Sequence, residues 1–147
     1  MPKIMLVGAV GCGKSTLCRA IEGLPPLEKK TQAIEALGSS IDTPGEYLEI
    51  HRLHRALAVT AAQADLILLI CSCTCRKNHF PAGFISIFGE KPVCGIISKA
   101  DMAHTRKDIA TARKTLSLAG VQKILTVSAK TGQGLDLLQR EIMNFGN

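Results

Sequence analysis

The residues with the clearest chemical meaning lie near the start of the chain, where residues 8–15 read Gly-Ala-Val-Gly-Cys-Gly-Lys-Ser. This segment fits the pattern G-x-x-x-x-G-K-[ST], and it follows an apolar run at residues 4–7 that is typical of a buried strand. Glycines let backbone N–H groups approach a polyphosphate closely, because they carry no side-chain bulk. The sequence therefore predicts that the chain binds a nucleoside triphosphate.

Each residue of this loop has a separate expected role. Gly8, Gly11 and Gly13 leave space for the phosphates. Lys14 is expected to lie along the β- and γ-phosphates, and Ser15 is expected to ligate Mg²⁺. A helix that begins near Gly13 would direct the positive end of its dipole toward the anion.

Length and composition narrow the class of protein. A chain of 147 residues is expected to form one domain over residues 1–147. Its apolar stretches are interrupted or shorter than the ~20 residues that a membrane helix needs, and its start lacks the pattern of a signal peptide. The six cysteines lie mostly in apolar segments, as free buried thiols do. These features predict a cytoplasmic protein in a reducing compartment, without membrane insertion.

The net charge of +6 raises the question of a nucleic acid partner. Part of this charge belongs to lysines in the nucleotide-site motifs, and the rest is spread over short helical faces. The chain has one tyrosine, and aromatic residues that would stack on bases do not alternate with the basic ones. We therefore do not expect nucleic acid to be a partner.

Strands and helices are expected to alternate along the chain. The predicted strands are residues 3–7, 32–37, 39–42, 66–71, 93–97 and 124–127, and the predicted helices are 14–22, 49–62, 106–119 and 134–145. The short connection around Gly38 favours antiparallel pairing, whereas the long apolar strands are typical of strands covered on both faces. The pattern predicts an α/β fold with a six-stranded, mainly parallel, doubly wound sheet, one antiparallel edge strand and helices on both faces.

Polar motifs follow three of the later strands, at the edge where ligands bind in such folds. Residues 42–45 read Asp-Thr-Pro-Gly, and this aspartate is expected to hold Mg²⁺ while the glycine N–H reaches the γ-phosphate. Residues 98–101 read Ser-Lys-Ala-Asp, and residues 128–130 read Ser-Ala-Lys. Four elements in order, each at a strand end, indicate a complete nucleotide site.

These motifs resemble those of translation-factor-type and Ras-like small GTPases, which are P-loop NTPases. The resemblance implies that Thr31 is the switch threonine that joins Mg²⁺ and senses the γ-phosphate. It also implies that Asp101 pairs with the guanine N1 and N2 protons, that Lys99 lies across the base, and that the Ala129 N–H donates to guanine O6. GTP or GDP with Mg²⁺ is therefore the expected ligand.

The candidate site residues form three groups. The nucleotide is expected to contact Gly8, Gly11, Cys12, Gly13, Lys14, Ser15, Thr16, Ser98, Lys99, Asp101, Ser128, Ala129 and Lys130. The residues expected to hold magnesium are Ser15, Thr31 and Asp42. The residues expected to act in catalysis are Lys14, Thr31, Gly45 and Glu46.

The chain resembles one subfamily more closely. Residues 8–18, 30–35, 41–47 and 80–84 are similar to the EutP/PduV family, and the similarity covers nearly the whole chain. That family is associated with bacterial microcompartments for ethanolamine or propanediol breakdown. The resemblance implies a location at such compartments and a shell or cytoskeletal protein as a partner.

Three departures from the GTPase pattern bear on rate and selectivity. Glu46 stands where many signalling GTPases have the glutamine that orients the attacking water, and its carboxylate would face a γ-phosphate. Val10 replaces a common glycine and would crowd an incoming arginine finger. Ser98 replaces the usual asparagine or threonine of the base-reading motif. We expect slow intrinsic hydrolysis and somewhat softened guanine selectivity.

Two other functional classes stay open. One is a binding module in which the nucleotide orders loops that bind a partner, with little turnover. The other is a small-molecule kinase that passes the γ-phosphoryl group of ATP to a carboxylate such as acetate. A lid-like arginine segment is not evident in the sequence, and the base-reading motifs favour guanine.

The run Cys71-Ser72-Cys73-Thr74-Cys75 is the remaining unusual motif. On an extended chain its three thiols would point to one face, which suggests a soft-metal or redox site. The spacing lacks the C-x-x-C of most zinc and iron–sulfur sites. Small buried residues at a strand end are the favoured interpretation.

Overall fold

The computed structural model describes residues 3–8, 14–21, 35–37, 40–42, 54–74, 80–103 and 106–144. Within these ranges the chain forms a sheet in the order β2-β3-β1-β4-β5-β6. The strands are β1 (Ile4–Gly8), β2 (Glu35–Leu37), β3 (Ser40–Asp42), β4 (Leu66–Ser72), β5 (Val93–Ser98) and β6 (Lys123–Thr126). The helices are α1 (Lys14–Ile21), α3 (His54–Ala61), α4 (Arg106–Leu118) and α5 (Leu135–Asn144), with short 3₁₀ helices η2 (Phe84–Phe88) and η3 (Ala100–Met102).

Among the described strands, β3, β1, β4, β5 and β6 pair in parallel, and β2 pairs with β3 in the antiparallel sense. The antiparallel pair lies at one edge of the sheet and brings Ala36 opposite Ile41. The prediction of an α/β fold with a mainly parallel sheet and an antiparallel edge is confirmed.

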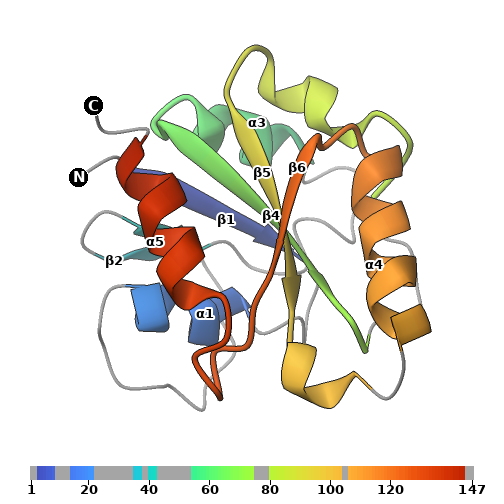
Figure 1. Ribbon diagram of the computed structural model, residues 1–147. Coiled ribbons are helices and arrows are strands. Elements are labelled where there is room, and N and C mark those ends of the chain that lie inside the picture. Colours follow the sequence, from blue (N-terminus) through green and yellow to red (C-terminus); the bar gives the residue numbers. More distant parts are fainter. Residues whose placement is uncertain are drawn as a thin grey trace.

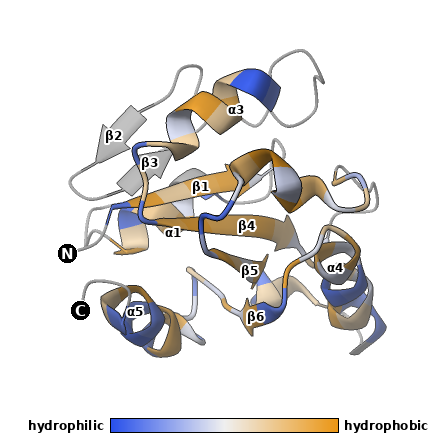
Figure 2. Ribbon diagram, turned by 90° about the horizontal axis from the view of Figure 1, so that it is seen from above, coloured by the Kyte–Doolittle hydropathy of each residue, from blue (hydrophilic) through white to orange (hydrophobic). Residues whose placement is uncertain are grey.

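Helices cover both faces of this sheet (Figures 1 and 2). Side chains alternate along a strand, so the even-numbered residues of β1 and β4 face one way and the odd-numbered residues face the other. Ile4 and Leu68 pack in one cluster with residues of α1 and α5. Met5 and Leu69 pack in a second cluster with residues of α3, η2 and α4. Burial on both faces explains why β1 and β4 are apolar at nearly every position.

The predicted bounds of the regular elements need small corrections. Ala119 lies in a turn after α4, because Gly120 has a φ of 109° and ends the helix. The last helix begins at Leu135, because Gly134 has a φ of 75° that is incompatible with helical geometry. Val127 lies just beyond β6. Ala62, the last residue of the predicted helix at residues 49–62, lies in a turn after α3. Residues 22, 32–34, 39, 49–53 and 145, which belong to the other predicted elements, lie outside the described residues.

The 3₁₀ helices have no counterpart in the prediction. Residues 84–88 are mostly apolar and too few to show a helical period, so their pattern resembles a short strand. Gly83 and Gly89, with φ of 71° and 65°, bracket this segment. Its Phe84 and Phe88 rings pack edge to face, with centroids 5.7 Å apart.

The free energy of unfolding is expected to depend on pH because of Cys94 in β5. Burial, which is the larger cause, and the charge of Glu141 raise the pKa of this thiol from 9.0 to about 11. The unfolded chain thus releases the proton at a lower pH than the folded chain. We expect the free energy of unfolding to fall by up to about 3 kcal/mol between pH 9 and pH 11 because of this group. Urea unfolding of wild type and Cys94→Ala at several pH values measures this fall. If the free energies of unfolding of the two proteins change in parallel with pH, Cys94 is not its cause.

Candidate functional site

The parallel arrangement places the polar motifs at one edge of the sheet. Gly8 ends β1 and pairs with Ile70 of β4, and Ser98 ends β5 and pairs with Ser72. Asp42 is the last residue of β3 and lies opposite Leu6. Because these strands are parallel, their carboxyl ends lie at the same edge of the sheet.

The structure describes only part of the predicted site. Gly11, Cys12, Gly13, Thr31, Gly45 and Glu46 lie outside the described residues. The backbone of Ser15 lies in the first turn of α1, directly after Lys14. Lys14 is 5% exposed, so this cation lies inside the protein at the positive end of a helix.

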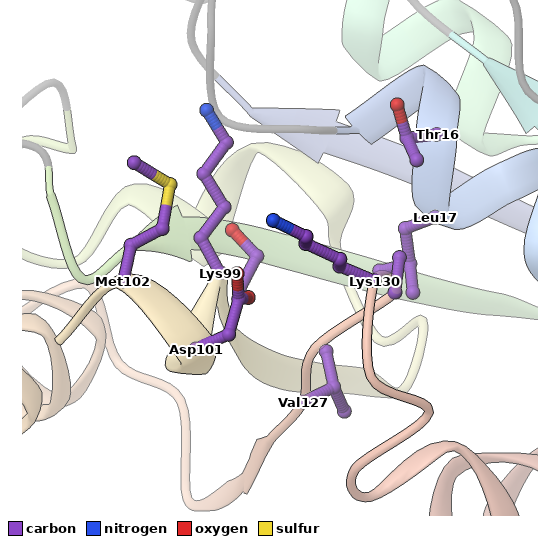
Figure 3. A pocket seen from close by; sticks show the side chains of 9 residues that line it. Thr16, Leu17, Lys99, Asp101, Met102, Val127 and Lys130 are labelled. Carbon is purple, nitrogen blue, oxygen red and sulfur yellow. The ribbon is translucent and has the colours of Figure 1, made fainter.

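A pocket of about 180 Å³ lies between α1 and the loops that follow β5 and β6. The residues that line it are Thr16, Leu17, Ser98, Lys99, Asp101, Met102, Val127, Ala129 and Lys130. Figure 3 shows Thr16 and Leu17 of α1 on one side and Lys99, Asp101 and Met102 on the other, with the Lys130 side chain extending between them. The structure therefore brings Thr16, three residues of the 98–101 motif and two of the 128–130 motif to one cavity.

A hydrogen bond joins the two later motifs across 27 residues of sequence. The Ser128 hydroxyl donates to Asp101 Oδ1 at 2.6 Å, and the same hydroxyl oxygen accepts from the Thr131 N–H at 3.1 Å. Ser128 is fully buried, whereas Asp101 is exposed at the pocket. A neutral donor of this kind fixes the orientation of a carboxylate, and the second carboxylate oxygen stays available to a ligand.

The turn after β6 holds Ser128 in place. The Ser128 N–H donates to Gln133 O at 2.9 Å, and the Gly132 N–H donates to Ser128 O at 2.9 Å. Gly132 and Gly134 both adopt positive φ, at 85° and 75°. A side chain at Gly132 would meet open space, whereas a Cβ at Gly134 would lie 2.2 Å from Thr126 O.

These two glycines give a matched pair of stability predictions. Gly132→Ala is expected to cost about 1 kcal/mol, because the only penalty is the left-handed backbone. Gly134→Ala should cost about 2 kcal/mol more, because its Cβ would overlap a backbone carbonyl that cannot move without breaking β6. Chemical denaturation measures both values, and equal losses would contradict the overlap expected at Gly134.

Sequence reasoning missed three residues that line the pocket. Leu17, Met102 and Val127 are apolar, and the sequence analysis predicts no ligand contact for them; it places Leu17 and Val127 in a helix and a strand. Met102 is half exposed, at 51%, and directly follows Asp101. Its position next to Asp101 is the signal that could have identified Met102 as a residue of the pocket.

Two of the three residues expected to hold magnesium, Ser15 and Asp42, have a described backbone. Ser15 supplies a hydroxyl and Asp42 a carboxylate, and hard oxygen ligands of this kind suit Mg²⁺. Strand β3, which carries Asp42 at its end, pairs directly with β1, and Ser15 lies at the start of the helix that follows β1. The backbone therefore brings both residues to the same edge of the sheet.

The two cysteines of the run that the structure describes, Cys71 and Cys73, lie in the apolar core. Cys71 and Cys73 both belong to the apolar cluster beneath α3 and α4, as the alternation predicts. Cys75 lies outside the described residues. In the part of the chain that the structure describes, three or more His, Cys, Asp or Glu side chains do not gather in a metal-binding arrangement. His54, from the predicted helix at residues 49–62, packs its ring edge to face on Phe84.

Comparison with solved structures shows which known fold the chain has. The fold is similar to Aquifex aeolicus Era bound to GDP·AlF4⁻, with a TM-score of 0.69, 20% identity and coverage of 98% of this chain and 56% of that chain. It is also similar to a probable GTP-binding protein engB, with a TM-score of 0.68, 19% identity and 97% coverage of both chains. The chain thus has the fold of the P-loop GTPases, although it spans just over half of the Era chain.

Sequence comparison then identifies the family. The chain belongs to the PduV-EutP family, described as ethanolamine utilisation and propanediol utilisation, whose profile matches residues 1–144. It is 38% identical over 136 residues to the propanediol utilization protein PduV of Citrobacter freundii, covering 92% of this chain and 89% of that protein. It is 37% identical over 124 residues to the probable acetate kinase EutP of Escherichia coli K12, covering 84% of this chain and 77% of that protein. The resemblance to the EutP/PduV family that the sequence motifs indicated is confirmed.

The helices of the described ranges are too short or too polar to cross a membrane.

Proposed function

We propose that this protein binds guanine nucleotides and slowly hydrolyses GTP to GDP and phosphate. The observation that carries the proposal is the Asp101–Ser128 hydrogen bond in the pocket beside α1. It joins the two base-reading motifs and aims a fixed carboxylate at the space between them. A carboxylate held in this way suits the paired N1 and N2 protons of guanine, whereas adenine presents an acceptor at N1.

The phosphates would lie at the other end of the site. Gly8 and the glycines at positions 11 and 13 would leave room for them, and Lys14 would contact the β- and γ-phosphates. Burial strengthens this contact, because the ammonium of Lys14 is largely removed from water. Magnesium, when bound, would neutralise charge on the β- and γ-phosphates, and Ser15, Thr31 and Asp42 would hold it.

Hydrolysis is proposed to be slow. Gly45 would contact the γ-phosphate through its N–H, and Glu46 would lie near the attacking water. A carboxylate at that position accepts a proton from water but is repelled by the phosphate. We place the protein in the cytoplasm at ethanolamine or propanediol microcompartments, where a shell or cytoskeletal protein would bind one nucleotide state.

Acetate kinase activity is the second candidate, because a relative covering 84% of this chain is named a probable acetate kinase. In that reaction acetate attacks the γ-phosphorus of ATP, and the products are acetyl phosphate and ADP. The same phosphate loop would serve both reactions. The pocket favours GTP, because a carboxylate at Asp101 faces the lone pair of adenine N1 without a hydrogen bond to gain.

Single-turnover release of labelled phosphate tests these proposals. Nucleotide-free protein is mixed with Mg·GTP or Mg·ATP, with and without acetate, and Lys14→Met serves as the background for contaminating phosphatases. Phosphate from GTP alone supports the GTPase. Acetate-dependent consumption of ATP supports the kinase, and tight GTP binding without turnover supports a nucleotide-controlled binding module.

A further inference from the structure

Cys73 links the end of β4 to the base-reading loop through two hydrogen bonds. Its N–H donates to Ser98 O at 3.1 Å, and its thiol donates to Lys99 O at 2.9 Å. The residue is 7% exposed and packs in the apolar cluster beneath α3 and α4. The side chain is therefore held firmly beside its own strand while it contacts the neighbouring loop.

The acceptor of the thiol belongs to a strained residue. Lys99 has φ 57° and ψ 37°, and it is the only non-glycine residue with positive φ in the described ranges. Such a conformation is unfavourable in an L-residue and persists only where the surroundings hold it. The Met102 N–H also donates to Lys99 O, at 2.8 Å, so both lone pairs of this carbonyl are engaged.

The left-handed conformation of Lys99 sets the direction of the chain that follows it. Directly after it the chain enters η3, which carries Asp101, and the Ala100 N–H donates to Val127 O at 3.1 Å. If Lys99 relaxed to an ordinary conformation, η3 would swing relative to β6. The Asp101 carboxylate would then lose its alignment with Ser128.

The thiol can act as a donor at neutral pH. Burial, and then the nearby carboxylates of Asp108 and Asp101, raise the pKa of Cys73 above 9.0. The S–H proton is therefore retained. An alanine at this position would keep the backbone N–H bond to Ser98 and would lose only the side-chain donor.

We propose that Cys73 is a positioning residue for guanine recognition, which holds Lys99 in its left-handed turn and thereby aligns Asp101. This role rests on the proposed binding of guanine nucleotides. It gives one thiol of the unusual cysteine run a function in selectivity rather than in metal binding or redox chemistry. The thiol of Cys71, two residues earlier on the same face, donates instead to Ser72 O of its own strand, at 3.8 Å.

The first experiment compares GDP with inosine diphosphate, which lacks only the 2-amino group that Asp101 would read. Cys73→Ala should lower the preference for GDP about threefold to tenfold, as expected for one lost hydrogen bond. Cys73→Ser, which keeps a donor, should restore the preference to within about twofold, and Cys71→Ala should retain it as the matched control. An unchanged preference in Cys73→Ala, or equal weakening of both nucleotides, would overturn the proposal.

A second measurement does not depend on the nucleotide. Amide hydrogen exchange of the free protein reports on Met102, whose N–H donates to the same carbonyl as the thiol. Faster exchange there in Cys73→Ala than in Cys71→Ala supports the restraint on Lys99, and equal exchange overturns it. If wild type does not prefer GDP over inosine diphosphate, guanine recognition itself is wrong, and the role of Cys73 in selectivity fails with it.

Discussion

Asp101→Asn is expected to weaken GTP binding about a hundredfold and to give the protein affinity for xanthosine triphosphate. The carboxylate would accept two charge-assisted hydrogen bonds from guanine, each worth about 1.5–3 kcal/mol. An amide presents one donor and one acceptor instead, and xanthine carries an oxygen where guanine carries its 2-amino group. Competition binding with GTP, xanthosine triphosphate and ATP measures the change.

The structure indicates that this substitution leaves the pocket intact. An asparagine Oδ1 can still accept from the Ser128 hydroxyl, which now donates to Asp101 at 2.6 Å. Asp136→Asn is a suitable control, because Asp136 is an acidic residue in the first turn of α5, away from the pocket residues. Equal loss of every nucleotide in Asp101→Asn would mean that Asp101 supports the fold of the loop and does not read the base.

Much of the fold could be predicted from the sequence because burial leaves a simple pattern. The runs Leu66–Ser72 and Val93–Ser98 are mostly apolar since helices cover both faces of their strands. Element ends were harder to predict, since they depend on single backbone angles. Gly120 and Gly134 set the end of α4 and the start of α5 through positive φ, which a hydrophobic pattern does not show.

The site was predictable where its residues form motifs with fixed spacing. Ser98, Lys99, Asp101, Ala129 and Lys130 could be assigned to one site because parallel strands end at one edge. The hydrogen bond between Asp101 and Ser128 joins residues that are distant in sequence. It depends on the register of β5 and β6, which the sequence motifs do not give.

Other contacts of the site could not be predicted, because their side chains look like core. Leu17 and Val127 are fully buried apolar residues, and the motif-based prediction reads such residues as packing alone. The contact of Cys73 with Lys99 depends on a left-handed turn that lysine rarely adopts. Sequence patterns reflect the average preference of each residue type. A functional site often contains residues in uncommon conformations, which the surrounding fold stabilises.

Lys14→Met is expected to reduce triphosphate binding about a thousandfold, which is a larger effect than its change in the stability of the free protein. The lost affinity corresponds to two charge-assisted hydrogen bonds to phosphate, at about 2 kcal/mol each. The effect on stability should be the smaller one, because the helix dipole disfavours a cation in the first turn of α1, where this side chain is 5% exposed. Methionine keeps the apolar stem and removes the buried charge.

Arg19→Met is the matched control, because Arg19 is the basic residue in the last turn of the same helix, where the dipole favours a cation. It should leave nucleotide affinity unchanged and lower stability slightly, which is the opposite of the pattern for Lys14. Fluorescent-nucleotide titration and thermal unfolding of the nucleotide-free proteins measure both properties. A large loss of stability in Lys14→Met would show that this lysine is a structural cation. Retained stability with lost affinity would show that the helix carries an unfavourable charge whose role is to bind phosphate.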